Sequence, residues 1–260
     1  MASATRQALA GAVTALAALK GVDRSAGEQV LSAGRLIGDS LPLRNLLADP
    51  AVETAAKQTV VSRLFGGFGA PALALITVLV VERWSSQDDL LAGFEEIGIR
   101  AIAATDSSID GELFAFARAV ASNNELELAV GSKLGDPAGR LALVISLLGE
   151  KASAGTIAII SHLVQQPRGR RIGRLLQDAA EIVADQAGDR IATVTSATTL
   201  TAAQLDRVRA SLAARYGGSL RINQEFDPGL IGGIRIQIGD DVIDGSVSAR
   251  INALRLQLAG

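Results

Sequence analysis

The sequence predicts a mainly α-helical protein: one or more N-terminal helical bundles, followed by a small α/β domain. Hydrophobic residues make up 48% of the chain, yet only 3% of its residues are aromatic, so the core must be aliphatic and rich in Ala and Leu. Both residues favour helices. Apolar residues recur at helical spacing until about Gly188, after which they alternate as in strands.

Composition and charge exclude several classes of protein. A formal net charge of -2 lacks the basic excess that a nucleic-acid binder needs. The chain has no cysteine and a single histidine, His162, which excludes disulfides, thiolate metal sites and multi-histidine metal sites. The longest apolar run, 72–81, is shorter than the ~20 residues of a membrane span. We expect this run to form a buried helix and the protein to be cytoplasmic.

Two portions of the helical region resemble each other, beginning at Asp49-Pro50 and at Asp136-Pro137. We expect each pair to supply an N-cap acid and a proline at the first helical position. In both, a glycine stop then leads into an apolar helix, and the leading helix is four residues longer in the first portion. We interpret this as a duplication, with domains at 1–105 and 106–187; the alternative is two unrelated helix trios.

Two amphipathic helices close these portions. The first covers 86–103, with Leu90, Leu91, Phe94, Ile97 and Ile102 near helical spacing. The second is predicted to open at Pro167, with Ile172, Leu175, Leu176, Ala179, Ile182 and Val183 on one stripe. Near its start lie Arg168, Arg170, Arg171 and Arg174. We favour a solvated basic face there over a site for lipid or an acidic partner.

The remaining residues, 188–260, read as a small α/β domain. Strands are predicted at 189–200 and 219–226, around a helix that starts with a Thr201–Gln204 capping box. In the stretch that follows, Gly232 and Gly233 indicate positive φ or close backbone approach. An alternating strand with Ile234, Ile236 and Ile238 on one face leads into the Gly239-Asp240 turn and a short return strand. Ser246 can cap a final helix with Val247, Ile251, Leu254 and Leu258 on a heptad-like stripe.

Residues that could carry chemistry are few. The chain has no phosphate-binding G-x-x-x-x-G-K-[ST] loop. Asp240, Asp241 and Asp244 could be pictured around magnesium, but acids also suit exposed turns, and we favour the turn. His162, Trp84 and Tyr216 are expected to be packing residues. We therefore predict no catalytic, cofactor or metal site, and a function in binding other proteins.

The stretch 227–258 closely resembles the C-terminal signature of the delta subunit of F-type ATP synthases, called the oligomycin-sensitivity-conferring protein in mitochondria. The matching residues are Asp227, Leu230, Ile231, Gly232, Gly233, Gly239, Asp240, Val242, Ile243, Asp244, Gly245 and Ser246. The likeness extends back to about Gly111. The longer N-terminal part is similar to the extended delta subunits of actinobacteria.

The resemblance implies a non-catalytic subunit of the peripheral stalk, or stator, at the cytoplasmic face of the cell membrane, which it would meet only through the complex. The helical part would bind the N-terminal helix of an alpha subunit, and the C-terminal domain would bind the distal end of the b subunits. Val247, Ile251, Leu254 and Leu258 are candidates for the b contact; packing of that helix on its own sheet is the alternative. A free-standing helical adaptor is the alternative function, and co-purification with a membrane-bound rotary complex would separate the two.

Overall fold

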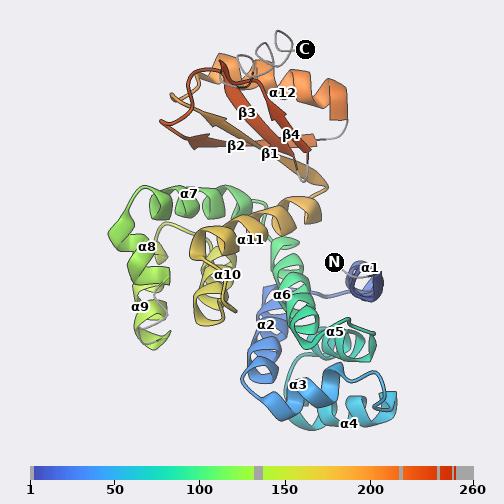
Figure 1. Ribbon diagram of the computed structural model, residues 1–260. Coiled ribbons are helices and arrows are strands. Elements are labelled where there is room, and N and C mark those ends of the chain that lie inside the picture. The colour runs from blue at the N-terminus through green and yellow to red at the C-terminus, as the bar shows by residue number, and fades with distance from the viewer. Residues whose placement is uncertain (1–2, 132–136, 217–218, 239–240, 248, 250–260) are drawn as a thin grey trace, which may run out of the picture. The chain divides into compact units, whose positions relative to one another are not determined.

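The computed structural model describes all residues except 1–2, 132–136, 217–218, 239–240, 248 and 250–260. The chain forms two compact units, Met1–Val183 and Ala184–Gly260 (Figure 1). The first is helical and the second is a small α/β unit, so the predicted fold class is confirmed. The division of the helical unit into domains 1–105 and 106–187 stays a prediction.

The helical part is a series of mostly short helices joined by short loops (Figure 1). Its first six helices are α1 (Ser3–Ala18), α2 (Arg24–Gly38), α3 (Leu41–Ala48), α4 (Thr54–Phe65), α5 (Ala70–Val81) and α6 (Gln87–Ala103). The next five are α7 (Ile109–Ala121), α8 (Asn124–Gly131), α9 (Pro137–Leu148), α10 (Ala154–Gln165) and α11 (Ile172–Gln186).

Helices α2 and α6 form the closest helix pair of the helical unit. A Cβ added at Gly27 of α2 would lie 2.8 Å from the backbone oxygen of Gly98 of α6, and one at Gly98 would meet Leu31 at 2.5 Å. Only glycine allows two backbones to approach this closely. The α6 stripe predicted from the sequence faces this contact and the core around it, and Leu90, Phe94, Ile97 and Ile102 are fully buried.

The lengths of successive helices support the internal repeat. Helices α3 and α8 have 8 residues each, α4 and α9 have 12 each, and α5 and α10 have 12 each. The predicted difference of four residues between the leading helices is therefore wrong. Asp49 ends α3 and accepts a hydrogen bond from the Ala51 amide at 2.8 Å, and α4 starts only at Thr54.

Each of the two portions has a side-chain hydrogen bond to the N-cap of its apolar helix. The Gln29 side chain of α2 accepts from the Gly69 amide at the N-cap of α5, at 2.8 Å. The Glu112 carboxylate of α7 accepts from the Ser153 amide at the N-cap of α10, also at 2.8 Å. The two bonds span 40 and 41 residues, so they are similar but not identical in spacing, and the duplication stays a prediction.

The C-terminal unit is a four-stranded mixed sheet in the order β2-β1-β3-β4, with one long helix. Its elements are β1 (Asp189–Ser196), α12 (Ala202–Tyr216), β2 (Ser219–Phe226), β3 (Ile234–Ile238) and β4 (Asp241–Asp244). Strand β1 is parallel to β2 and antiparallel to β3, which is antiparallel to β4.

One face of this sheet packs against α12 and forms a small core. Its buried residues are Ala192, Val194, Leu212, Leu220, Ile236 and Ile238. The predicted alternation in β3 is confirmed, since Arg235 and Gln237 are exposed. The predicted capping box is confirmed too: the Thr201 amide donates to Gln204 Oε1 at 2.8 Å, and the Gln204 amide donates to Thr201 Oγ1 at 3.4 Å.

Candidate interaction surfaces

The turn between β2 and β3 is held by backbone conformations that require glycine. Gly232 and Gly233 have φ values of 65° and 79°. A Cβ on Gly233 would lie 2.5 Å from the carbonyl oxygen of Gly245, so this position also permits a close approach of two backbones. Hydrogen bonds from Gly245 N to Ile234 O (3.0 Å) and from Val247 N to Gly232 O (3.2 Å) tie the turn to the chain after β4.

Acids and a serine complete this structure, which we call the signature loop (227–233 and 244–247). Asp227 Oδ1 accepts from the Gly229 amide at 2.9 Å, and Asp244 Oδ1 accepts from the Ser246 amide at 2.9 Å. The Ser246 hydrogen bonds, and to a lesser degree Arg235, lower the pKa of Asp244. Ser246 Oγ in turn accepts from the Ala249 amide at 3.1 Å, as a helix cap does. The acids therefore serve as turn residues.

The signature loop leaves an apolar surface exposed. Ile231 is 72% exposed and Val247 is 43% exposed, and a Cβ on Gly232 would touch Val247 at 3.3 Å. Val247 and Ala249 are helical, as the predicted final helix requires. The other predicted contact residues, Ile251, Leu254 and Leu258, lie outside the described residues, as do Gly239 and Asp240.

A second apolar surface lies on α5. The prediction of a buried helix at 72–81 holds for one face only, where Ala72, Leu75, Ile76, Leu79 and Val80 are buried. The opposite face is partly or fully exposed and consists of Ala70, Leu73, Ala74, Thr77, Val78 and Val81. It carries no charge, and the Thr77 hydroxyl donates to Leu73 O of its own helix at 2.7 Å. A surface helix normally has a polar outer face, so this α5 face is suited to contact with another protein.

The matching helix of the second portion, α10, is covered by its own chain. It packs against α2 and α6, and seven of its residues are buried, among them His162. The Arg35 guanidinium of α2 lies 2.9 Å from His162 Nδ1, and Glu95 of α6 lies 3.6 Å from His162 Nε2. The position equivalent to Val78 is therefore closed in the second portion by contacts with the first.

Glu95 is the centre of an ionic cluster at this junction, and it overturns one prediction. Arg170 Nη2 donates to both Glu95 oxygens at 2.8 and 2.7 Å, and Arg168 Nη2 lies 2.9 Å away. Arg168 and Arg170 therefore do not belong to a merely solvated basic face. The cause is a loop: α11 starts at Ile172, not at Pro167 as predicted, and Arg168 has a left-handed backbone with φ 47°.

The electrostatics of the cluster favour a charged Glu95 and a neutral His162. Burial alone would raise the pKa of Glu95, but hydrogen bonds from His162 and Arg170 and the nearby arginine charges hold it at about 2. Burial lowers the pKa of His162, and Arg35 and Arg168 add to this despite the opposing effect of Glu95. A neutral His162 accepts from Arg35 at Nδ1 and presents its Nε2 proton to Glu95. Its predicted packing role is thereby confirmed.

One feature of the sequence could have predicted this cluster. Glu95 falls inside the apolar stripe of α6, four residues after Leu91 and next to Phe94, and it is only 5% exposed. A buried carboxylate needs partners of opposite charge, and the arginines near Pro167 were the available ones.

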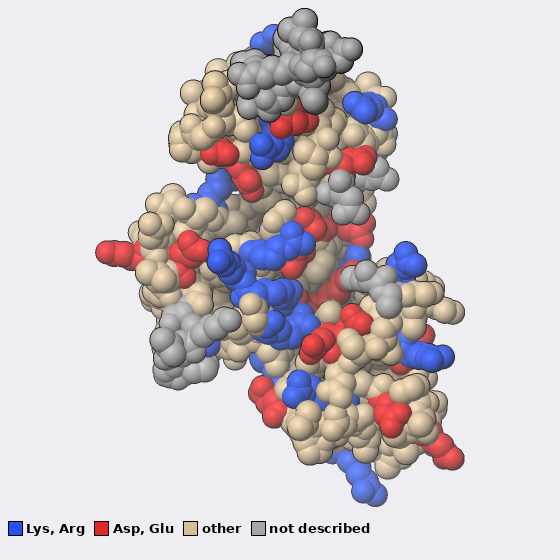
Figure 2. Space-filling model, in the orientation of Figure 1, with Lys and Arg blue, Asp and Glu red and all other residues tan. Residues whose placement is uncertain are grey.

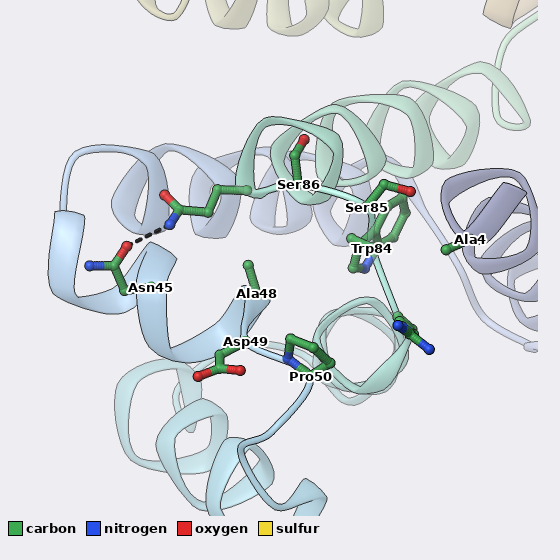
Figure 3. Close-up of a pocket in the computed structure, with 10 residues that line it drawn as sticks. Ala4, Asn45, Ala48, Asp49, Pro50, Trp84, Ser85 and Ser86 are labelled. Atoms are coloured by element: carbon green, nitrogen blue, oxygen red, sulfur yellow. Dashed lines mark hydrogen bonds between the residues drawn. The ribbon is translucent and has the colours of Figure 1, made fainter. Parts of the chain in front are cut away.

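A pocket of about 650 Å³ lies at one end of the first helical portion (Figure 3). Ala4, Asn45, Asp49, Pro50 and the segment from Arg83 to Gln87 line it. Trp84 is 5% exposed and donates from Nε1 to Leu79 O at 2.7 Å, which confirms its predicted packing role. The pocket's hydrogen bond between Gln87 and Asn45, at 2.5 Å, is a neutral amide pair. The pocket brings together no pair of a nucleophile and a base.

No helix among the described residues is long and apolar enough to cross a membrane. No group of three or more His, Cys, Asp or Glu residues in the described part of the chain could hold a metal ion.

The fold and its surfaces define a helical protein with a small α/β unit and exposed apolar side chains on both units. Residues 101–258 match the model of one family, the ATP synthase delta (OSCP) subunit. The chain belongs to this family. It is 53% identical over its full length to the full-length ATP synthase subunit delta of Leifsonia xyli subsp. xyli. It is 37% identical to that of Kineococcus radiotolerans, with 90% of this chain and 87% of the relative covered.

Among solved structures, a chain from the mitochondrial ATP synthase hexamer of Toxoplasma gondii has 19% identity and a TM-score of 0.43, over 64% of this chain and 96% of its own length. This likeness is too loose to locate an interface. Family membership makes the chain an ATP synthase subunit, a structural component of the complex and not a catalytic one. Family membership therefore decides against the alternative function, a free-standing helical adaptor.

Proposed function

We propose that this chain is the stator joint of its ATP synthase, linking the alpha/beta catalytic head to the b subunits so that rotor torque drives ATP synthesis. The observation that carries the proposal is the presence of an apolar surface on each compact unit, the partly exposed α5 face and the exposed signature loop. A joint that resists torque needs a separate attachment for each partner. It performs no bond chemistry, in keeping with a structural subunit.

The head end of the joint is the α5 face, which binds the N-terminal helix of an alpha subunit. An apolar, uncharged helix surface suits an amphipathic helix whose apolar side chains repeat every three to four residues. The first helical portion is favoured over the second because the equivalent part of α10 is closed by Arg35 and Glu95 around His162. The extra domain 1–105 thus supplies the alpha site, and 106–187 braces it.

The b end of the joint is the signature loop with the helix that the sequence predicts from Val247 onward. Ile231 and Val247 are exposed, and Gly232, the residue after Ile231, lies against Val247. The heptad spacing continues through Ile251, Leu254 and Leu258, as a helix–helix contact with the C-terminal region of b requires. Because α12 already covers one face of the sheet, the unit has a core without this helix. The joint would lie at the cytoplasmic face of the membrane and meet the membrane only through the complex.

Coupling of ATP hydrolysis to proton pumping tests this proposal. Membranes from cells lacking the chain should hydrolyse ATP without pumping, or lose the head altogether on washing, because nothing prevents the head from turning with the rotor. Adding the purified full-length chain should restore pumping. Full pumping in washed membranes that lack the chain would contradict the stator role.

A further inference from the structure

A cleft with basic walls lies next to the Glu95 cluster, where the two portions of the helical unit meet. It measures about 570 Å³. Gly38, Asp39 and Arg44 line it from the first portion, Asp88, Leu91 and Ala92 from α6, and the segment from Gln165 to Arg168 and Arg170 from the second portion. Figure 2 shows a band of basic side chains across the middle of this face of the helical unit.

Most of the basic groups here already have acidic partners. Glu95 holds Arg168 and Arg170, and Asp178 lies 3.4 Å from Arg170 and 2.7 Å from Arg174. These arginines are fixed in place, and little of their charge remains for a ligand.

Arg44 differs from them. Its Nε–H is buried, and no acceptor for it exists among the residues that the structure describes. A buried donor without an acceptor is unfavourable by about 1–3 kcal/mol. The Arg44 side chain lines the cleft from α3. Arg171 is exposed just before α11, and it too forms no ion pair within the described part of the chain. Arg44 and Arg171 therefore carry positive charges that no acid among the described residues pairs with.

We propose that this cleft binds an acidic peptide segment of a partner protein, with Arg44 as the anchoring side chain. A glutamate or aspartate of the segment pairs with the Arg44 guanidinium where this side chain lines the cleft, in a charge-assisted hydrogen bond. The inference stands independently of the stator role.

The rest of the lining favours a peptide over a compact anion such as phosphate. Leu91 and Ala92 offer apolar contact. The side-chain nitrogens of Gln165 and Gln166 already donate to Ser161 O and Arg35 O, but their side-chain oxygens can accept from a peptide backbone. Asp39 and Asp88 at the cleft would repel a small, doubly charged anion that has no apolar part to bury. An extended segment with one acid at Arg44 can keep its other groups away from these carboxylates.

The test uses the full-length chain and the Nε–Hε resonance of Arg44, followed by NMR. The probe is a short capped peptide of alternating Glu and Leu; a matched Gln–Leu peptide and inorganic phosphate are the comparison ligands. We expect the Glu–Leu peptide to shift the Arg44 resonance, more strongly at low salt, and the other two to leave it in place.

Variants show whether Arg44 anchors the segment. Arg44→Gln should weaken peptide binding about tenfold, the ratio that corresponds to loss of one charge-assisted hydrogen bond. Arg44→Lys should retain part of the affinity, and Arg63→Gln, on the exposed side of α4, should retain all of it. The proposal is overturned if phosphate shifts Arg44 as the peptide does, if no probe shifts it, or if Arg44→Gln and Arg63→Gln bind alike.

Discussion

Replacing Glu95 by glutamine should destabilise the helical unit by about 3 kcal/mol. The carboxylate is 5% exposed and receives two hydrogen bonds from Arg170 and the charge of Arg168. Its pKa of about 2, against an ordinary value of 4.5, corresponds to about 3 kcal/mol at about 1.4 kcal/mol per pH unit. Removing one partner of a buried ion pair typically costs about 3–5 kcal/mol. The lower end of this range applies because the side chains of Arg168 and Arg170 are 18% and 26% exposed, so water can solvate them when the carboxylate is removed.

Urea unfolding followed by the emission of Trp84 measures this effect, since Trp84 is the chain's only tryptophan and is buried beside α6. With a slope of about 1–3 kcal/mol per molar urea, the midpoint should fall by roughly 1–3 M. The matched control is Glu28→Gln, whose exposed pair with Arg24 should be worth no more than about 0.5 kcal/mol.

The pH dependence of stability gives a second readout for the same variant. Because the folded-state pKa of Glu95 is depressed, its contribution is complete above pH 4.5 and is lost as the pH falls towards 2. Glu95→Gln should therefore unfold with a weaker dependence on pH in this window. A variant within 1 kcal/mol of the unmodified chain, with an unchanged acid profile, would refute the ionic junction.

Three further substitutions test separate parts of the fold. Gly233→Ala should destabilise the C-terminal unit by at least about 2 kcal/mol, because its φ is 79° and a Cβ meets a backbone oxygen at 2.5 Å. Amide hydrogen exchange of β3 measures this loss. The control is Gly67→Ala, at a position where a Cβ meets nothing, and it should leave the exchange unchanged. Glu112→Ala should destabilise the helical unit by about 2 kcal/mol, since it removes an acceptor from the N-terminus of α10; thermal unfolding by circular dichroism would show it, and an unchanged midpoint would contradict it. Gly93→Ala should shift the emission of Trp84 to the red, because a Cβ would lie 2.2 Å from the indole ring; an unaltered spectrum would mean that the ring is not held there.

The sequence predicted the fold well where local signals and tertiary packing agree. The helix at 86–103, the capping box at Thr201 and the positive φ at Gly232 and Gly233 all follow from local chemistry, and the structure confirms them. Prediction failed at Asp49 and Pro167, where an acid–proline or a proline alone suggests a helix start. At Asp49 the end of helix α3 determines the backbone conformation. At Pro167 the Glu95 cluster determines it.

The interaction surfaces were only partly predictable, for a physical reason. Spacing made Val247 a candidate contact residue, but exposure of Ile231 depends on a turn formed by two separate segments. The α5 face was missed because an entirely apolar helix has no polar side to show which face remains open. The partner of Arg168 was missed because it lies more than 70 residues away in the chain.

The most direct test of the stator joint is binding of two partner segments to the full-length chain: the N-terminal segment of the alpha subunit and the C-terminal segment of b. Thr77→Glu, at the middle of the α5 face, should abolish binding of the alpha segment and leave the b segment bound. Ile231→Asp, on the exposed signature loop, should have the reverse effect. Loss of both segments in one variant, or of neither in both variants, would contradict a joint with one attachment surface on each unit.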